Sequence, residues 1–265
     1  MFKKILLIII FILIPQSLLA NKDRIIIAST TSTYDTGLLG YINKEFEKNH
    51  DIKIHVLALG TGQAIINAQQ GNADILLVHH EPSEIQFMKE GYGIERHNLM
   101  YNDFILVGPK INKDKCTTIN QFLLNIINSK YLFISRGDES GTHLKEKDIW
   151  KNLGFNTDFF SSWYKKVGQG MGATLIISNE LKAFTLTDRS TWISFNKKEN
   201  LKIICENSPP IINQYSIIAV NPKLNTNINS TWAKKYIKWI ISDEGKKLIN
   251  EFKIKNKQMF FFNNH

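Results

Sequence analysis

The stretch RIIIASTTSTYDTGLLGYINKEFEKN, residues 24–49, decides how the rest of the chain is interpreted. Residues 24–29 are mostly β-branched and apolar, as in a strand that is buried on both faces. From Leu38 onward, apolar residues recur at the spacing of one helix face. The segment between them is crowded with serine and threonine. The stretch therefore predicts a strand, a hydroxyl-rich loop and a helix whose N-terminal turn includes Asp35 and Thr36.

The same alternation of strand and helix continues along the chain. A second helical pattern covers residues 61–71, and residues 229–252 are helical with a new start at Ser242, where two acidic residues follow. Further strand-like runs occupy residues 52–59, 73–78, 103–108, 131–135, 201–205 and 215–220. This order predicts an α/β fold with a doubly wound sheet and helices on both of its faces. In such sheets, ligands bind at the carboxyl ends of the strands.

The first twenty residues are set apart from the fold. Lys3 and Lys4 precede a ten-residue apolar run, and a more polar end follows before the charged residues 21–24. This pattern predicts a secretory signal peptide over residues 1–20 and an exported, periplasmic mature protein. An uncleaved membrane anchor is the alternative, because Leu18 is a poor match to the small residue expected near a cleavage site. No later run is apolar for long enough to span a membrane.

The charge and the cysteines narrow the function classes. The net charge of +9 is spread over surface-type segments and indicates a mild general attraction for anions. No recognition-helix or RNA-binding motif accompanies it, so nucleic acid is not an expected partner. Two cysteines, Cys116 and Cys205, allow at most one disulfide, and their spacing leaves open whether they pair or are separate buried thiols.

Four loops share one pattern, in which serine, threonine and glycine precede a helical or apolar segment. They are STTSTYDTG (29–37), GTGQ (60–63), SRGDESGTH (135–143) and GQGMGAT (168–174). Backbone N–H groups at helix N-termini, together with hydroxyls, form anion sites, and four such loops predict one shared site. Independent helix caps are the alternative for each loop taken alone.

The third of these loops adds a cation to the candidate site. Arg136 precedes Ser140, Gly141 and Thr142, so a guanidinium group and a helix N-terminus are placed to face one ligand. Pairing of Arg136 with a carboxylate of the same loop is the alternative.

Patterns typical of enzymes and metal sites are weak in this chain. Ser140, His143 and Asp138 contain the residue types of a catalytic triad, but no G-x-S-x-G elbow is present. The segment VHHEP (78–82) has adjacent histidines, which point to opposite sides of a strand end and rarely bind one metal together. The G-x-G-x-G of residues 168–172 lacks the context of a dinucleotide site. Catalysis, a bound metal and a cofactor are therefore not expected.

Eight motifs in order carry a resemblance to a known family. They are STTSTYDTGLLGYINKEFEK (29–48), LALGTGQAI (57–65), GNADILLVHH (71–80), GYGIERHNLMYNDFILVGP (91–109), SRGDESGTHLKEKDIW (135–150), WYKKVGQGMGATL (163–175), FTLTDRSTWI (184–193) and YSIIAVNP (215–222). Together they resemble the tungstate-binding proteins of bacterial ABC importers, the TupA family. Ser29 replaces the threonine with which the family signature usually opens, and the hydroxyl is retained. The R-x-x-x-S-G-T of Arg136 to Thr142 is also similar to phosphate-binding importers.

The resemblance implies a type II periplasmic-binding-protein fold, with two α/β lobes, a hinge and a central cleft. One lobe would comprise residues 21–109 plus 212–265, and the other residues 110–211. The function implied is that of a monomeric, non-catalytic receptor that captures tungstate and delivers it to a membrane permease. The implied ligand-binding residues are Thr31, Ser32, Thr33, Thr61, Gly62, Arg136, Ser140, Gly141, Thr142, Gly172 and Ala173.

The chemistry of the anion favours tungstate or molybdate over phosphate. Tungstate carries no proton near neutral pH, so its site should offer donors, whereas phosphate keeps a proton and accepts a carboxylate neighbour. Where phosphate binders of this fold tend to place an aspartate, this chain has LLVHH (76–80). Tungstate and molybdate are nearly alike in size and charge, so their separation rests on the resemblance. The alternatives are a molybdate or phosphate receptor of the same fold, and a secreted α/β hydrolase.

Overall fold

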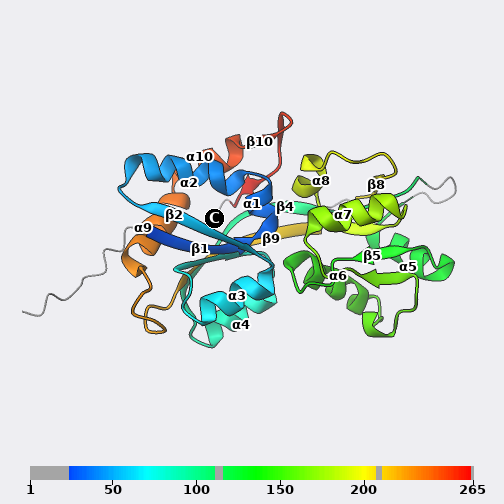
Figure 1. Ribbon diagram of the computed structural model, residues 1–265, viewed down its shortest axis with the longest axis horizontal. Helices are drawn as coiled ribbons and strands as arrows, with labels where there is room; N and C mark the ends of the chain where they lie inside the picture. Colours follow the sequence, from blue (N-terminus) through cyan, green and yellow to red (C-terminus); the bar gives the residue numbers. More distant parts are fainter. Residues whose placement is uncertain (1–23, 111–115, 207–210, 264–265) are drawn as a thin grey trace, which may run out of the picture.

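The structure is a computed structural model that describes residues 24–110, 116–206 and 211–263. The predicted signal peptide, residues 1–20, lies outside the described residues. Within those three ranges, no helix is long and apolar enough to cross a membrane. Two lobes lie side by side, and two long strands run between them (Figure 1).

The first lobe is built on three parallel strands. β1 (Arg24–Thr30) pairs in parallel with β2 (Lys53–Leu59) and with β3 (Ile75–Val78), as the buried apolar runs predict. The other elements of this lobe are α1 (Thr31–Asp35), α2 (Leu38–Asn49), α3 (Thr61–Gln69), α4 (Glu81–Lys89), α9 (Ser230–Ile240), α10 (Asp243–Glu251), β10 (Lys253–Ile254), β11 (Lys257–Gln258) and β12 (Phe261–Phe262).

Helices cover both faces of this sheet because the side chains of β1 alternate. Ile25 and Ile27 pack with α2, α9 and α10 on one face, whereas Ala28 packs with α3 and α4 on the other. Figure 1 shows α2 and α10 above the sheet and α3 and α4 below it. The predicted new helix at Ser242 is confirmed, because Ser242 is the N-cap of α10.

One detail of the opening stretch differs from its prediction. Asp35 and Thr36 were expected in the first turn of the helix that carries Leu38, but Asp35 ends α1 and Thr36 is the residue after it. Gly37 then adopts a left-handed backbone with φ 82° and becomes the N-cap of α2. Glycine adopts this conformation without a Cβ clash, so the helix is interrupted at Gly37 and two separate helices form.

The long strands β4 (Gly93–Gly108) and β9 (Ile211–Val220) make the sheet mixed rather than wholly parallel. They pair with each other in antiparallel fashion, and β9 also pairs with β3 in antiparallel fashion. The strand order is β12-β4-β9-β3-β1-β2, and the last residues of β4 pair with two further strands, β7 (Thr185–Asp188) and β8 (Lys202–Cys205). Since β4 leads from the first lobe into the second and β9 leads back, the two strands must run in opposite directions.

The second lobe has its own core around the far end of β4. Phe104 and Leu106 of β4 pack with Phe133 and Trp150 in one cluster, and Ile105 contributes to a cluster on the opposite face. The elements of this lobe, apart from β7 and β8, are α5 (Ile119–Ser129), β5 (Phe133–Ser135), α6 (Gly141–Asn152), a 3-10 turn (Thr157–Phe159), β6 (Tyr164–Lys166), α7 (Met171–Glu180) and α8 (Arg189–Ser194).

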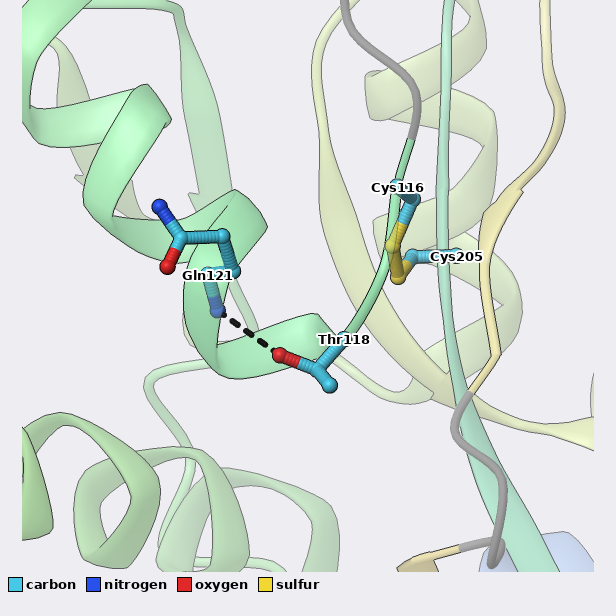
Figure 2. Close-up of a disulfide and its surroundings, with 4 residues drawn as sticks. All are labelled: Cys116, Thr118, Gln121 and Cys205. Carbon is cyan, nitrogen blue, oxygen red and sulfur yellow. Dashed lines mark hydrogen bonds between the residues drawn. A yellow bond between two sulfur atoms is a disulfide. The ribbon is translucent and has the colours of Figure 1, made fainter.

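A disulfide settles the question that the cysteine spacing leaves open. Cys116 and Cys205 are bonded, with their Cα atoms 5.4 Å apart, and they join the segment before α5 to the end of β8 (Figure 2). Thr118, two residues after Cys116, caps α5 by accepting a hydrogen bond from the Gln121 N–H at 3.1 Å. The disulfide therefore fixes the entry into α5 against the β4–β8 edge of the second lobe.

We expect the disulfide to stabilise the folded protein, because it closes a long loop in the unfolded chain. Replacing both Cys116 and Cys205 by serine should lower the free energy of unfolding by about 2–4 kcal/mol. Urea unfolding of the wild type with and without dithiothreitol provides the measurement, and the reduced wild type should match the double variant. Identical urea midpoints in all three samples would contradict the expectation.

Candidate functional site

All four predicted loops lead into helices. α1, α3, α6 and α7 begin directly after extended N-cap residues, which are Thr30, Gly60, Ser140 and Gly170. Of these four, Ser140 alone caps its helix with its side chain, accepting a hydrogen bond from the His143 N–H at 3.3 Å. The first-turn N–H groups of α1, α3 and α7 thus have no side-chain cap, which is the arrangement that suits an anion.

The loops before α3 and α6 bring the two lobes into contact. The Gly62 N–H donates to the Glu139 carbonyl at 3.1 Å. A methyl group on Gly62 would lie 3.2 Å from the Glu139 carbonyl oxygen, and one on Gly60 would be in ordinary contact with Ser140, 3.6 Å from its Cα. Thr61 therefore lies beside the first turn of α6. Because the Gly62 N–H already donates to the Glu139 carbonyl, it is not available to a ligand. The role of this glycine is to let the two loops approach each other closely.

Arg136 directly follows β5, and its side chain is 3% exposed. One terminal nitrogen, Nη2, pairs with Asp138 Oδ2 at 2.6 Å, so the carboxylate pairing considered from the sequence does occur. The Arg136 carbonyl accepts hydrogen bonds from the N–H groups of Gly168 and Gln169, at 2.7 and 3.3 Å. These bonds hold the loop before α7 beside the backbone of Arg136. That loop leads to Gly172 and Ala173 in the first turn of α7.

Seven buried side-chain polar atoms have no hydrogen-bond partner among the described residues. Four of them are Ser135 Oγ, His143 Nε2, Asp188 Oδ2 and Thr191 Oγ1. The other three are donors of residues in the predicted site, Thr61 Oγ1, Arg136 Nε and Thr142 Oγ1, and these three residues are 0%, 3% and 1% exposed, respectively. A buried polar group without a partner is costly, so native proteins rarely keep one without a reason. One donor comes from the first lobe and two come from the second, which is the pattern expected of a site that a ligand completes.

The hydroxyls of α1 are partly committed to local bonds. Thr33 Oγ1 donates to the Thr30 carbonyl at 2.8 Å, and Ser32 Oγ lies 3.3 Å from the Tyr215 hydroxyl. Thr31 is half-buried. Burial raises the pKa of Asp35, at the end of α1, and the charge of Arg136 lowers it, so Asp35 and Arg136 act on each other electrostatically. α1 thus borders the region of Arg136. Its first-turn backbone N–H groups are available to an anion, whereas the Thr33 hydroxyl is already bonded.

A buried network of polar side chains lies where β4 and β9 pass between the two lobes. The sequence analysis did not predict it. Asn102 of β4 and Asn213 of β9 are directly opposite in register, and Asn213 Nδ2 donates to Asn102 Oδ1 at 2.7 Å. The network continues to His79, whose Nδ1 lies 2.6 Å from Asn213 Oδ1, and to Ser190, whose Oγ accepts from Asn102 Nδ2 at 3.0 Å. Asn102 and Asn213 lie just before the apolar runs 103–108 and 215–220. Because they are polar, the apolar pattern does not include them in the predicted strands.

The enzyme-like patterns have structural explanations. The Ser140 hydroxyl caps α6, and His143 Nδ1 accepts the Glu139 N–H at 3.0 Å, so these side chains do not form a triad. His79 and His80 contact different partners, the latter lying 2.7 Å from the Ser83 hydroxyl through its Nδ1. Across the described ranges, no group of three or more His, Cys, Asp or Glu side chains is arranged to hold a metal ion.

A buried carboxyl supports the second-lobe part of the site. Glu146 of α6 accepts hydrogen bonds from the Tyr164 hydroxyl at 2.6 Å and the Trp150 indole at 3.2 Å. Burial raises the pKa of Glu146 to about 7. Because Tyr164 belongs to β6, the bond ties the helix that begins at Gly141 to the strand that leads toward α7.

The fold and the inter-lobe site define the class of the protein, and comparisons with known proteins agree. The family model for the periplasmic-binding-protein (PBP) superfamily domain matches residues 19–244. A tungstate-binding protein TupA from Peptoclostridium acidaminophilum is 43% identical over 236 residues, which cover 87% of this chain and 82% of that protein. Another, from Campylobacter jejuni, is 43% identical over 235 residues, covering 86% and 87% of the two chains.

Solved structures give the same result. The TupA structure from Desulfovibrio alaskensis G20 is 37% identical, with a TM-score of 0.76, and the match covers 91% of this chain and 99% of that one. A tungstate ABC transporter structure from Geobacter sulfurreducens is 38% identical, with a TM-score of 0.78 and coverage of 87% and 99%. The chain is therefore a member of the PBP superfamily and, within it, belongs to the TupA family.

We expect Glu146 to make stability depend on pH. Its pKa is about 7 in the folded protein, above the ordinary 4.5, so the folded state binds the additional proton between these values. The free energy of unfolding should therefore fall as the pH rises from about 4.5 to about 7. Glu146→Gln removes the cost of a buried charge and should stabilise the protein by roughly 1–3 kcal/mol near pH 8, with little effect near pH 5.

Urea unfolding at both pH values measures this effect. Glu251→Gln, at an exposed position at the end of α10, serves as the matched control and should be nearly neutral at both. If the Glu146→Gln effect were the same at the two pH values, the buried carboxyl would not be the titrating group.

Proposed function

We propose that this protein is the substrate-binding component of a tungstate ABC transporter, a receptor that binds and delivers its ligand without catalysis. The observation that carries the proposal is the set of buried donors Thr61 Oγ1, Arg136 Nε and Thr142 Oγ1, which come from both lobes. The TupA relatives are named for tungstate binding, and their similarity over most of the chain supports tungstate as the ligand. The ligand would be the oxyanion itself, with no separate cofactor.

The proposed ligand-binding set combines three kinds of donor. Hydroxyls come from Thr61 and Thr142, a charged N–H comes from Arg136, and backbone N–H groups come from the uncapped first turns. Donors of a charged group form the stronger bonds to an oxyanion. The proposed site is lined by Thr31, Ser32, Thr33, Thr61, Gly62, Arg136, Ser140, Gly141, Thr142, Gly172 and Ala173. Within this set, the Gly62 N–H and the Thr33 hydroxyl are already bonded to the carbonyls of Glu139 and Thr30 and would not donate to the ligand.

We place the hinge at the Asn102–Asn213 pair. Residues 21–109 with 212–265, and 110–211, were the lobes expected from the sequence. Phe104 packs with Phe133 of the second lobe, which favours a crossing within β4 rather than after it. The polar pair supports a pivot there, because side-chain hydrogen bonds on facing strands join the lobes without a close-packed apolar core.

The balance of donors and acceptors supports a fully deprotonated anion. The neighbouring carboxylate, Asp138, is already occupied by Arg136 Nη2 and by the Ser140 N–H at 3.3 Å. A phosphate that kept its proton would have to compete for this acceptor. Molybdate satisfies the same donors as tungstate and is the alternative ligand. The protein would act as a periplasmic monomer that presents the loaded cleft to a membrane permease.

We expect the purified protein to bind one equivalent of tungstate. Isothermal titration calorimetry should give a stoichiometry of one, with molybdate next in affinity and with phosphate and sulfate weaker. Binding to the folded state alone should also raise the melting temperature in proportion to the logarithm of the ligand concentration. Absence of heat with both tungstate and molybdate would contradict the proposed function, and a preference for phosphate would favour a phosphate receptor of the same fold.

We expect Arg136→Ala to weaken tungstate binding at least about tenfold, since a hydrogen bond to a charged group contributes about 1.5–3 kcal/mol. Arg24→Ala is the matched control, because Arg24 is exposed at the end of β1 that lies away from α1. Calorimetry compares the affinities, and circular dichroism checks the fold. Unchanged affinity in Arg136→Ala would mean that the guanidinium serves its pair with Asp138 alone.

A further inference from the structure

His79 follows β3 in the first lobe, and its ring is held in one place. Asn213 donates through its amide nitrogen to Asn102 Oδ1 and to the Tyr215 hydroxyl at 3.0 Å, so its oxygen faces His79 and accepts the Nδ1 proton. The imidazole also stacks on Tyr215 and Phe104, with ring centroids 4.8 and 6.3 Å away. Burial lowers the pKa of His79 to about 4, so the ring is neutral at the pH of the cell envelope.

The opposite edge of the ring meets Gly141 of the second lobe. A methyl group on Gly141 would lie 2.6 Å from both Cε1 and Nε2 of His79 and 2.8 Å from Cδ2. Real side chains do not approach so closely, so the α6 backbone rests directly on the imidazole. The ring cannot move aside at low cost, because the Asn213 hydrogen bond and two aromatic neighbours hold it.

The contact lies at the first turn of α6, beside the unpartnered hydroxyl of Thr142. The position at which α6 stops against the ring therefore sets how far the Thr142 donor lies from Thr61, across the lobes. We propose that His79 is a positioning residue that acts as a spacer: its ring is the surface on which α6 seats when the lobes close, and it fixes the width of the oxyanion cleft. This inference rests on the proposed function, because it concerns the same cleft.

The test is a pair of substitutions that interact through the spacer. Gly141→Ala keeps the backbone N–H and adds a methyl group where the ring lies, so it should hold the lobes apart. Overpacking of this kind costs about 1–3 kcal/mol, which corresponds to about 5- to 150-fold weaker tungstate binding in calorimetry. Adding His79→Ala to Gly141→Ala removes the ring and should recover most of that loss. Gly40→Ala is the matched control, because its methyl group would meet open space on α2.

Several outcomes distinguish the inference from the proposed function. If the wild type does not bind tungstate, the proposed function itself fails. If the wild type binds and Gly141→Ala binds equally well, or the double variant is no better than Gly141→Ala, the spacer is overturned. Melting of the ligand-free variants confirms that each is folded. Should His79→Ala not fold, His79→Asn supplies a shorter side chain with an amide donor.

A second readout separates spacing from general support of the fold. Sulfate is smaller than tungstate, so a cleft held open by the ring should favour the larger anion. His79→Ala should therefore lower the ratio of tungstate to sulfate affinity, measured by calorimetry with sodium salts of each anion. A structural role without spacing would weaken both anions equally, and an unchanged ratio would overturn the proposal.

Discussion

The antiparallel ladder between β4 and β9 is the constraint on which the rest of the molecule depends. It runs from Gly93 opposite Val220 to Phe104 opposite Ile211, and both lobes are attached to it. Because backbone hydrogen bonds resist slippage, the ladder fixes which residues of the two lobes face one another. It also brings Asn102 and Asn213 together where the chain passes between cores. The relative positions of the four loops rich in serine, threonine and glycine therefore depend on the β4–β9 register, which is formed by residues distant from most of these loops in sequence.

The candidate site contains buried hydrogen-bond donors whose burial without a partner costs free energy. Thr61 and Thr142 are almost fully buried and keep hydroxyls that no described residue satisfies. The apolar clusters of the two lobes are formed by other residues, and their burial stabilises the fold. In the proposed function, a tetrahedral dianion would offset this cost by accepting from several donors at once, and binding would then be linked to the contact between the lobes.

Sequence reasoning succeeded where the signal was local. The buried runs 24–29, 52–59 and 73–78 correspond closely to β1, β2 and β3, and the four loops do precede helices. One local prediction was wrong: Asp35 does not belong to the following helix, because the left-handed backbone of Gly37 separates α1 from α2. Other differences arise where residues distant in sequence decide the outcome. Strand β4 proved longer than residues 103–108, since polar positions that face β9 carry no apolar signal.

The sequence by itself determined the α/β class, the helix N-termini that follow the hydroxyl-rich loops, and the residue types that suit an anion, because these depend on residue spacing within a few turns of the chain. The family was identified from the resemblance of eight motifs along the sequence. The tertiary structure alone decided the Cys116–Cys205 bond, the commitment of the Thr33 hydroxyl to its own turn, and the seat of Gly141 on His79. Each of these is a contact or a choice of partner in three dimensions, and the free energy of such a contact depends on packing that no local pattern encodes.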